Sequence, residues 1–154
     1  MADAGAQTAS FAGTAESLAP ARDFLRRYLT DAGWPGSDLD AVIALGEIIQ
    51  NVVRHGFHGG RTEGTITITV EILNDRLVVL VEDNAPPSLP LGWLGAGRRP
   101  HEGGLGLGIA RRIASKIDFQ PVENGNRALL EFFPEKRQRD AEKVYEKLFL
   151  SPII

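Results

Sequence analysis

GEIIQNVVRHGFHGG, residues 46–60, combines an apolar and a polar stripe in one helical run. At about 100° per residue the apolar side chains share one half of the helical wheel. These apolar residues are Leu45, Ile48, Ile49, Val52 and Val53. Glu47, Asn51 and His55 share the other half at successive i+4 positions. By itself the polar stripe fits a solvated helix face as well as side chains arranged for chemistry on a metal-bound phosphate, so the surrounding sequence has to decide.

The composition is that of a single globular domain of 154 residues, long enough to bury a core. A formal net charge of -3 gives no basic character that would favour nucleic acid. The chain has no cysteine, which excludes disulfides, thiolate zinc sites and cysteine nucleophiles. It shows no signal peptide and no apolar stretch near the roughly 20 residues of a membrane span. We therefore expect a cytoplasmic protein without a membrane segment.

Two helices are expected in the first part of the chain. Residues 17–32 repeat apolar side chains at helical spacing, with Ser17 placed as N-cap and a glycine at position 33. Ser37 followed by Asp40 resembles a capping box and opens a second helix, which should run to about His55. Gly56 is placed to end it.

Strands follow these helices. Residues 65–73 and 76–83 read as two strands, joined by the turn pair at 74–75, and residues 127–133 as a final strand. Residues 84–103 are dense in proline and glycine and predict a long flexible loop. Residues 103–118 start glycine-rich and continue as an amphipathic helix.

The order of elements favours an α/β (α+β) two-layer sandwich, with a mixed or antiparallel sheet covered by helices on one face. The expected amphipathic helix at 103–118 carries Ile109, Ile113 and Ile117 on one stripe. We expect a leader at 1–16 that is either flexible or strand-like, a domain at 17–133, and a C-terminal amphipathic helix at 134–154.

Two more features are candidates for a binding or catalytic role. Asp83 ends an apolar strand, where its carboxylate either faces a cleft or begins the turn that follows. GGLGLG, residues 103–108, opens a helix, and glycines at a helix start let backbone N–H groups approach phosphate. The chain has no P-loop pattern. A long loop rather than a strand precedes the glycines, which argues against a dinucleotide fold.

Taken in order, these motifs resemble a known superfamily. A helical Glu-x-x-x-Asn, a strand-end Asp, a Pro/Gly-rich lid and Gly-x-Gly-x-Gly on a helix are typical of the Bergerat fold of GHKL ATPases. This is the ATP-binding domain of histidine kinases, gyrase, Hsp90 and mismatch-repair ATPases. The runs ALGEIIQNVVRHGF and EGGLGLGIARRI look most like the bacterial anti-sigma factor serine/threonine kinases. The resemblance covers roughly residues 10–133.

The resemblance implies a role for each matching residue. Asn51 would give its side-chain oxygen to Mg²⁺, Glu47 would act as general base, and Asp83 would accept from the adenine amine of ATP. The glycines that would serve the phosphates and the flexible ATP lid at 84–103 are Gly104, Gly106 and Gly108. Arg98 and Arg99 in the lid are either phosphate or partner contacts, or solvated charges.

The same resemblance implies partners. They are a sigma factor and a STAS-domain anti-anti-sigma protein phosphorylated on Ser or Thr. Because members of that family often dimerise, the resemblance also implies a second copy of the chain as a partner. Two departures from the family pattern stand out: Ala85 and Pro87 replace glycines after Asp83, and Asn126 and Arg127 stand where a threonine is common. A non-catalytic partner-binding module, or a kinase in a cascade that does not end in a sigma factor, therefore stays open.

Overall fold

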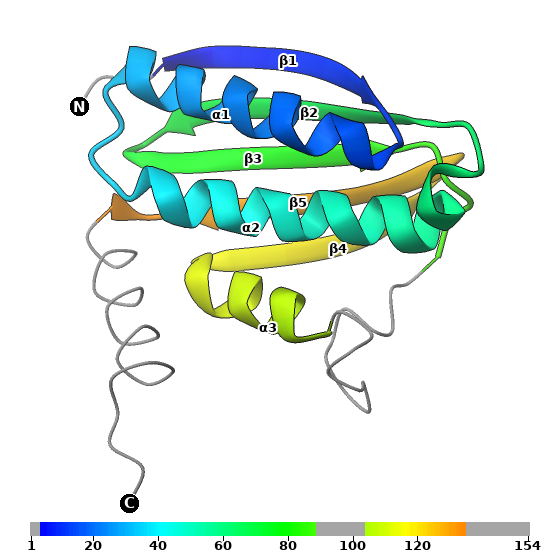
Figure 1. Cartoon of the computed structure of the whole chain (residues 1–154). Helices are drawn as coiled ribbons and strands as arrows, with labels where there is room; N and C mark the ends of the chain where they lie inside the picture. The colour runs from blue at the N-terminus through cyan, green and yellow to red at the C-terminus, as the bar shows by residue number, and fades with distance from the viewer. Residues whose placement is uncertain (1–3, 89–103, 135–154) are drawn as a thin grey trace, which may run out of the picture.

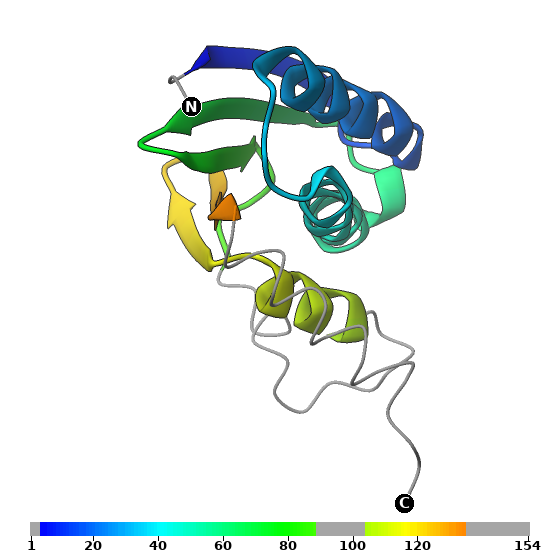
Figure 2. The same cartoon turned by 90° about the vertical axis from the view of Figure 1, so that its left-hand side faces the viewer.

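The computed structural model describes residues 4–88 and 104–134 as one sheet with helices packed on one face (Figures 1 and 2). The strands are β1 (Ala4–Ala12), β2 (Thr65–Leu73), β3 (Arg76–Asp83), β4 (Lys116–Val122) and β5 (Gly125–Phe132). The helices are α1 (Leu18–Ala32), α2 (Asp38–Asn51) and α3 (Gly104–Ile113). The short turns are a 3₁₀ turn at Ala15–Ser17, a π-helical turn at Val52–Gly56 and a 3₁₀ turn at His58–Gly60. The two-layer α+β prediction is confirmed.

All strand pairs in the described sheet are antiparallel, in the order β1-β2-β3-β5-β4. β2 and β3 have the predicted bounds, and the turn at Asn74 and Asp75 has positive φ at both residues, as a tight hairpin requires. Side chains alternate between a buried face toward the helices and a more exposed outer face. None of the described helices is long and apolar enough to cross a membrane.

The predicted caps at Gly33 and Ser37 are present, whereas the predicted N-cap at Ser17 is not. The Ser17 hydroxyl donates to the Ala12 carbonyl at 2.6 Å and caps no helical N–H, because a 3₁₀ turn leads into α1. Gly33 ends α1 with a φ of 68°, the left-handed conformation that glycine adopts freely. At α2 the Ser37 hydroxyl accepts from the Asp40 N–H at 3.1 Å, so the predicted cap is present.

Residues 4–12 form a strand and not a flexible leader. β1 pairs along β2, and two pairs of side-chain hydroxyls reinforce the pairing on the exposed face, Thr8 with Thr69 and Ser10 with Thr67, each at 3.0 Å. Of the two alternatives for residues 1–16, the strand is therefore correct for 4–12. Cross-strand hydroxyl pairs of this kind add to the stability of an edge strand.

Residues 114–118 do not continue the third helix. The Ala114 N–H makes the last helical bond to Ala110, and the Ser115 N–H already donates to the Glu131 carbonyl of β5. β4 then alternates half-buried Ile117 and Phe119 with exposed polar residues, a period-2 pattern. Ile117 thus packs from a strand, which the sequence interpretation missed. The expected helix at 134–154 lies outside the described residues.

Phe57 closes the core beyond α2. Its ring lies between Gly13 and Gly64, where a Cβ on either glycine would overlap ring atoms. The Gly13 N–H donates to the Gly64 carbonyl at 2.9 Å, so the two glycines form one slot. Phe57 is 1% exposed, which places the aromatic residue of the HGF run in the core.

Tyr28 ties α1 to the irregular start of β1. Its hydroxyl accepts from the Ile72 N–H at 3.0 Å and lies within hydrogen-bond distance of the carbonyls of Ala4 and Gly5, to one of which it donates. The register of β1 shifts between Ala4 and Gln7, so the hydroxyl serves an N–H for which the interrupted ladder gives no partner. Burial raises the pKa of Tyr28 above its usual 10.0.

Replacing Tyr28 with Phe should lower the free energy of unfolding by about 1–3 kcal/mol, because the Ile72 N–H would remain buried without an acceptor. Urea unfolding measures the change. Arg27→Ala on the exposed side of α1 is the control and should stay within about 0.5 kcal/mol of wild type. Equal stability of the two variants would contradict the role given to the hydroxyl.

Candidate functional site

Four chain segments meet at one end of the fold. The C-terminal end of α2, the end of β3, the start of α3 and the start of β5 lie at the same side of the molecule in Figure 1. They bring Asn51, Asp83 and Gly104 to this end although the three lie far apart in the sequence. The order of motifs predicted from the sequence therefore corresponds to one region in space.

Asn51 is the most unusual residue at this end. It is 2% exposed, and its Nδ2 donates to the Glu47 carbonyl at 2.8 Å. Among the described residues its Oδ1 is buried without any hydrogen-bond partner. A buried acceptor without a hydrogen bond lowers the free energy of unfolding by about 1–3 kcal/mol, so such an atom calls for an explanation. Because Nδ2 is held by the preceding helical turn, Oδ1 is turned away from the helix backbone.

The residues present fit a magnesium ion held through Asn51. Within the described ranges no group of three or more His, Cys, Asp or Glu side chains could hold a metal. Mg²⁺ does not need such a group, because it keeps several waters and takes one or two protein oxygens together with substrate phosphates. A fixed, desolvated amide oxygen supplies a ligand of this kind.

Glu47 lies one turn before Asn51 and is half-buried. No hydrogen bond or ion pair links its carboxylate to the other described side chains. After Asn51 the helix widens into a π turn, in which the Phe57 N–H donates to the Val52 carbonyl at 3.2 Å. His55 lies in this turn and is exposed, so it does not continue the buried stripe of Asn51.

Asp83 faces the helix layer at the end of β3. Its Oδ1 accepts from the Ala85 N–H at 3.0 Å and from Asn126 Nδ2 at 3.1 Å. Burial raises the pKa of Asp83 above its usual 3.8, while these two hydrogen bonds act in the opposite direction and favour the carboxylate. A partly desolvated carboxylate with one oxygen engaged is suited to accept a hydrogen bond from a ligand.

Ala85 fits its position without the freedom of glycine. It has no positive φ, and its methyl group is 2% exposed. A Cβ added at Gly56 would come within 3.0 Å of the Ala85 Cβ, so the π turn packs directly against the segment after Asp83. The departure at Ala85 therefore fills space between the two parts of the site.

Gly125 and Asn126 are site residues that the sequence interpretation did not assign. A Cβ on Gly125 would overlap the Asp83 carbonyl oxygen, so only glycine lets β5 begin this close to β3. Asn126 is paired with Asp83 in the sheet register. The signal available was the position of both residues at the start of the last strand, beside the strand that ends in Asp83.

The family model of histidine kinase-like ATPase domains matches residues 11–132, which is most of the described structure. The chain belongs to this family. None of the curated proteins matches the chain.

Solved structures agree with this fold assignment. The RsbU and RsbW domains of Rv1364c from Mycobacterium tuberculosis share 20% identity at a TM-score of 0.60, over 84% of this chain and 32% of that one. The catalytic domain of histidine kinase ThkA shares 20% sequence identity at a TM-score of 0.55, and the match covers 85% of this chain and 99% of that one. The histidine kinase domain of a blue-light-activated histidine kinase from Erythrobacter litoralis shares 13% sequence identity at a TM-score of 0.52. That match covers 67% of this chain and 47% of that one. The chain thus spans about a third of the first protein and about half of the third.

In this ATPase domain the glycine motif begins α3 as predicted, since the helix starts at Gly104. A Cβ on Gly108 would meet nothing within 4 Å, so packing does not require glycine there. The structure places Gly106 in the first turns of α3. Arg98 and Arg99 lie outside the described residues, as does most of the expected lid.

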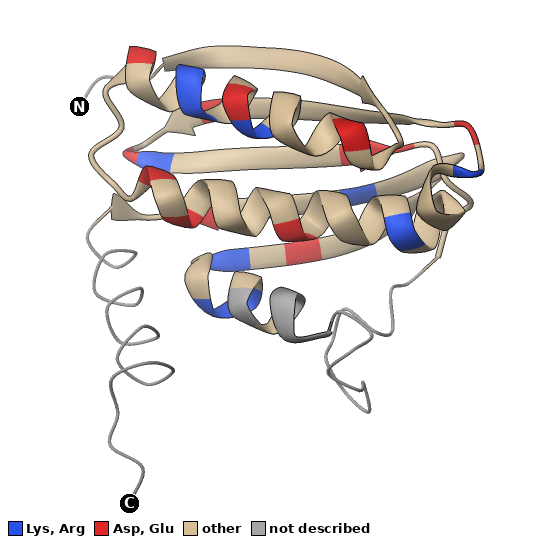
Figure 3. Ribbon diagram, in the orientation of Figure 1, with Lys and Arg blue, Asp and Glu red and all other residues tan. Residues whose placement is uncertain are grey.

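The described surface carries both charge signs. Figure 3 shows acidic and basic residues interspersed over the helices and strands on the side in view. Two cross-strand pairs, Arg127 with Glu82 at 3.1 Å and Arg76 with Glu131 at 3.4 Å, balance charges on the outer face of the sheet.

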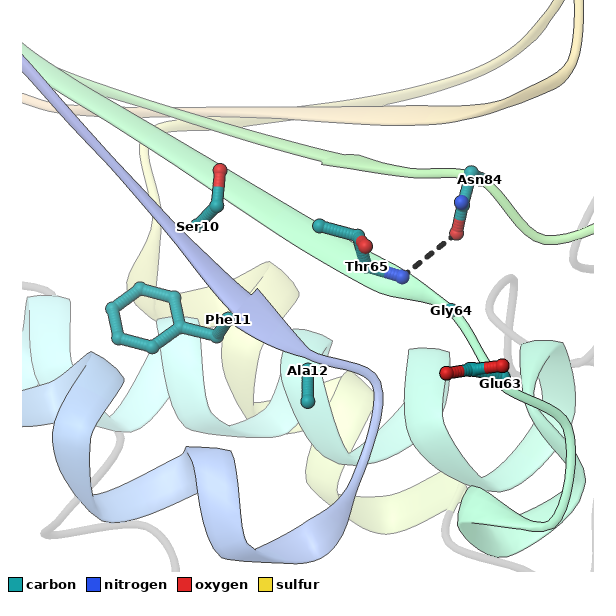
Figure 4. A pocket seen from close by; sticks show the side chains of 7 residues that line it. All are labelled: Ser10, Phe11, Ala12, Glu63, Gly64, Thr65 and Asn84. Atoms are coloured by element: carbon teal, nitrogen blue, oxygen red, sulfur yellow. Dashed lines mark hydrogen bonds between the residues drawn. The ribbon is translucent and has the colours of Figure 1, made fainter.

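Two hollows lie beside the candidate site. One of about 630 Å³ is lined by Ser10, Phe11, Ala12, Glu63, Gly64, Thr65 and Asn84 (Figure 4). There the Asn84 Oδ1 accepts from the Thr65 N–H at 2.8 Å, which fastens the residue after Asp83 to the start of β2. The other, of about 340 Å³, lies between the start of α1 and the end of α2. Neither contains Glu47, Asn51 or Asp83.

Gly125→Ala should destabilise the domain by about 1–3 kcal/mol, because the new methyl group would push β5 away from the Asp83 carbonyl. Thermal or urea unfolding measures the loss. Gly5→Ala is the matched control, since a Cβ at Gly5 meets nothing within 4 Å. Wild-type stability of Gly125→Ala would disprove the close approach of the two strands.

Asp83→Asn should unfold at an equal or higher temperature than wild type at pH 7. Because the folded protein raises the Asp83 pKa, its stability contribution is present below pH 3.8 and is lost as pH rises through the folded pKa. The Asp83→Asn variant avoids this loss. Its melting temperature relative to wild type should therefore rise as pH increases from 3.8 through the folded pKa of Asp83, and it should stay higher at neutral pH. Melting curves from pH 3 to pH 8 check this, and an advantage that shrinks with rising pH would contradict the assignment.

Proposed function

We propose that this domain is an ATP-dependent serine/threonine protein kinase of a partner-switching cascade. In this proposal it holds a sigma factor and phosphorylates a STAS-domain anti-anti-sigma protein in the cytoplasm. The observation that carries the proposal is the buried, unpartnered Oδ1 of Asn51, one turn after Glu47 and at the same end of the fold as Asp83. An anti-sigma role is supported further by the likeness to a structure that contains an RsbW domain.

Each residue has a separate task in this proposal. Asn51 would hold Mg²⁺ through Oδ1, and the ion, when bound, would supply charge neutralisation on the phosphates of ATP. Asp83 accepts a hydrogen bond from the exocyclic amine of adenine. The N-terminal turn of α3, from Gly104, offers backbone N–H groups and the positive end of a helix dipole to the phosphates. Arg98 and Arg99 stay candidate contacts to phosphate or partner.

Glu47 performs the proton transfer. The hydroxyl oxygen of a partner serine or threonine forms a bond to the γ-phosphorus while the bond to the β–γ bridging oxygen breaks, which leaves ADP. Glu47 takes the hydroxyl proton. Phosphoryl transfer depends mainly on alignment and charge neutralisation, so a few well-placed groups are enough.

A second function keeps the fold without catalysis. The departures at Ala85 and Pro87 favour a module that only binds partners, whereas the ordinary backbone and good packing of Ala85 argue that the base site is intact. Titration calorimetry with Mg-ATP separates the two. No detectable heat at millimolar nucleotide would overturn the kinase proposal. Pull-down from the native host would show whether the captured partner is a sigma factor, which separates the proposed cascade from one that does not end in a sigma factor.

Glu47→Gln should lower the rate of phosphate transfer to the cognate STAS partner by about 10²–10⁴-fold, the usual contribution of a general base. Its affinity for Mg-ATP should stay close to wild type, because the amide keeps the shape of the side chain. Transfer of labelled γ-phosphate measures the rate, and calorimetry measures the affinity. A rate within about threefold of wild type would exclude Glu47 as the base.

A further inference from the structure

Asn126 makes an unusually complete set of contacts for a half-buried side chain at a strand start. Its Nδ2 donates to Asp83 Oδ1 at 3.1 Å and to the Pro86 carbonyl at 3.2 Å, with the Ala85 carbonyl at 3.5 Å. Its Oδ1 accepts from the Ser88 N–H at 2.9 Å. Both amide hydrogens and one oxygen lone pair are therefore engaged.

These contacts also fix the orientation of the amide. Rotating the amide by 180° would place its oxygen against the Asp83 carboxylate and the Pro86 carbonyl, and its NH₂ group against the Ser88 N–H. That orientation opposes acceptor to acceptor and donor to donor, so only the observed one satisfies the network. The Asn126 amide therefore has one stable orientation.

The consequence for Asp83 is an unequal pair of oxygens. Oδ1 receives two donors, from Asn126 and from the Ala85 N–H, whereas no described residue donates to Oδ2. Two donors on one oxygen restrict rotation of the carboxylate. The remaining oxygen is presented in a fixed direction, and within residues 4–88 and 104–134 its lone pairs are not used.

We propose that Asn126 is the positioning residue of the base site: its amide joins Asp83 and the backbone of residues 85–88 into one frame, which leaves a single carboxylate oxygen to select a purine by its amine donor. The inference rests on the proposed nucleotide binding. Asn126 itself does not read the base, because its donors are used within the protein. A threonine hydroxyl has a single donor, so it could donate to Asp83 or to the Pro86 carbonyl but not to both.

The selection follows from hydrogen-bond polarity. Adenine offers an amine at position 6 to the free oxygen, whereas hypoxanthine offers a carbonyl, which opposes an acceptor to a carboxylate. A site built to accept from one donor discriminates strongly against an analogue that lacks it, because the buried group is then left unpaired. Discrimination of ATP against ITP therefore reports how firmly Asp83 is held.

The first experiment needs no nucleotide. In Asn126→Ala the Asp83 pKa should rise above its wild-type value, because a hydrogen bond that favours the carboxylate is lost, and the Ser88 amide should lose protection from hydrogen exchange. NMR titration of the carboxyl carbon and amide exchange measure the two effects. In Asn126→Thr the Asp83 pKa should return toward wild type, because the hydroxyl can donate to the carboxylate. A wild-type Asp83 pKa and a wild-type Ser88 amide in Asn126→Ala would overturn the proposed frame.

The second experiment measures affinity for Mg-ATP and Mg-ITP by calorimetry. Asn126→Ala should bind ATP about tenfold more weakly, as expected for the loss of a hydrogen bond to a charged group, and its preference for ATP over ITP should shrink. Asn126→Thr should recover part of the preference. The matched control is Arg127→Ala on the adjacent position, whose side chain pairs with Glu82 on the outer face of the sheet and should change neither affinity.

The outcomes separate this inference from the proposed function. Wild-type protein that binds neither nucleotide refutes the proposed function, and the two NMR measurements then judge the frame alone. Wild-type protein that prefers ATP, with an unchanged preference in Asn126→Ala, refutes the positioning role and leaves the function standing. A reduced preference in Asn126→Ala together with an unchanged one in Arg127→Ala supports the inference.

Discussion

The burial of α2 is the constraint on which the rest of the structure depends. This helix packs against the sheet with α1 and α3 on either side, and it is buried over most of its surface, including positions that a surface helix would expose. A helix in this position leaves little room for a polar group that has no purpose. Asn51 is carried into the interior by its place on α2, and the helical turn before it satisfies only one end of the amide. The fold thus prepares a desolvated oxygen at the end of α2, on the side of the molecule where β3 ends and α3 begins.

The sequence predicts the parts of this site better than their connections. The bounds of β2 and β3, the cap at Ser37 and the glycine end of α1 follow from local patterns, and the structure confirms them. β4 was missed because residues 114–118 extend the helical spacing of apolar side chains in α3. Only the pairing with β5 shows that the chain has changed from helical to strand periodicity. The strand at 4–12 is stabilised largely by contacts with β2 and Tyr28, which no local pattern contains.

The contacts around Asp83 could not have been predicted from local sequence. Asp83 and Asn126 are 43 residues apart, and only the register of β3 with β5 places them opposite each other. The need for glycine at position 125 likewise arises from a carbonyl on a different strand. Such contacts also explain why the departure at Ala85 is harmless to the backbone, since its methyl group fills the space beside Gly56. A motif therefore names the residues of a site, whereas the sheet register determines what they do.

The π turn after Asn51 has a consequence for how this region tolerates changes in length. A π turn is an α-helix with one additional residue accommodated in a single wide turn. Removing one residue between Val52 and Gly56 would restore α-helical phase and rotate everything that follows, so that Phe57 would no longer meet the slot between Gly13 and Gly64. Segments that share this turn should therefore keep its length, and an aligned relative with a gap at this point should be treated as having a different helix end.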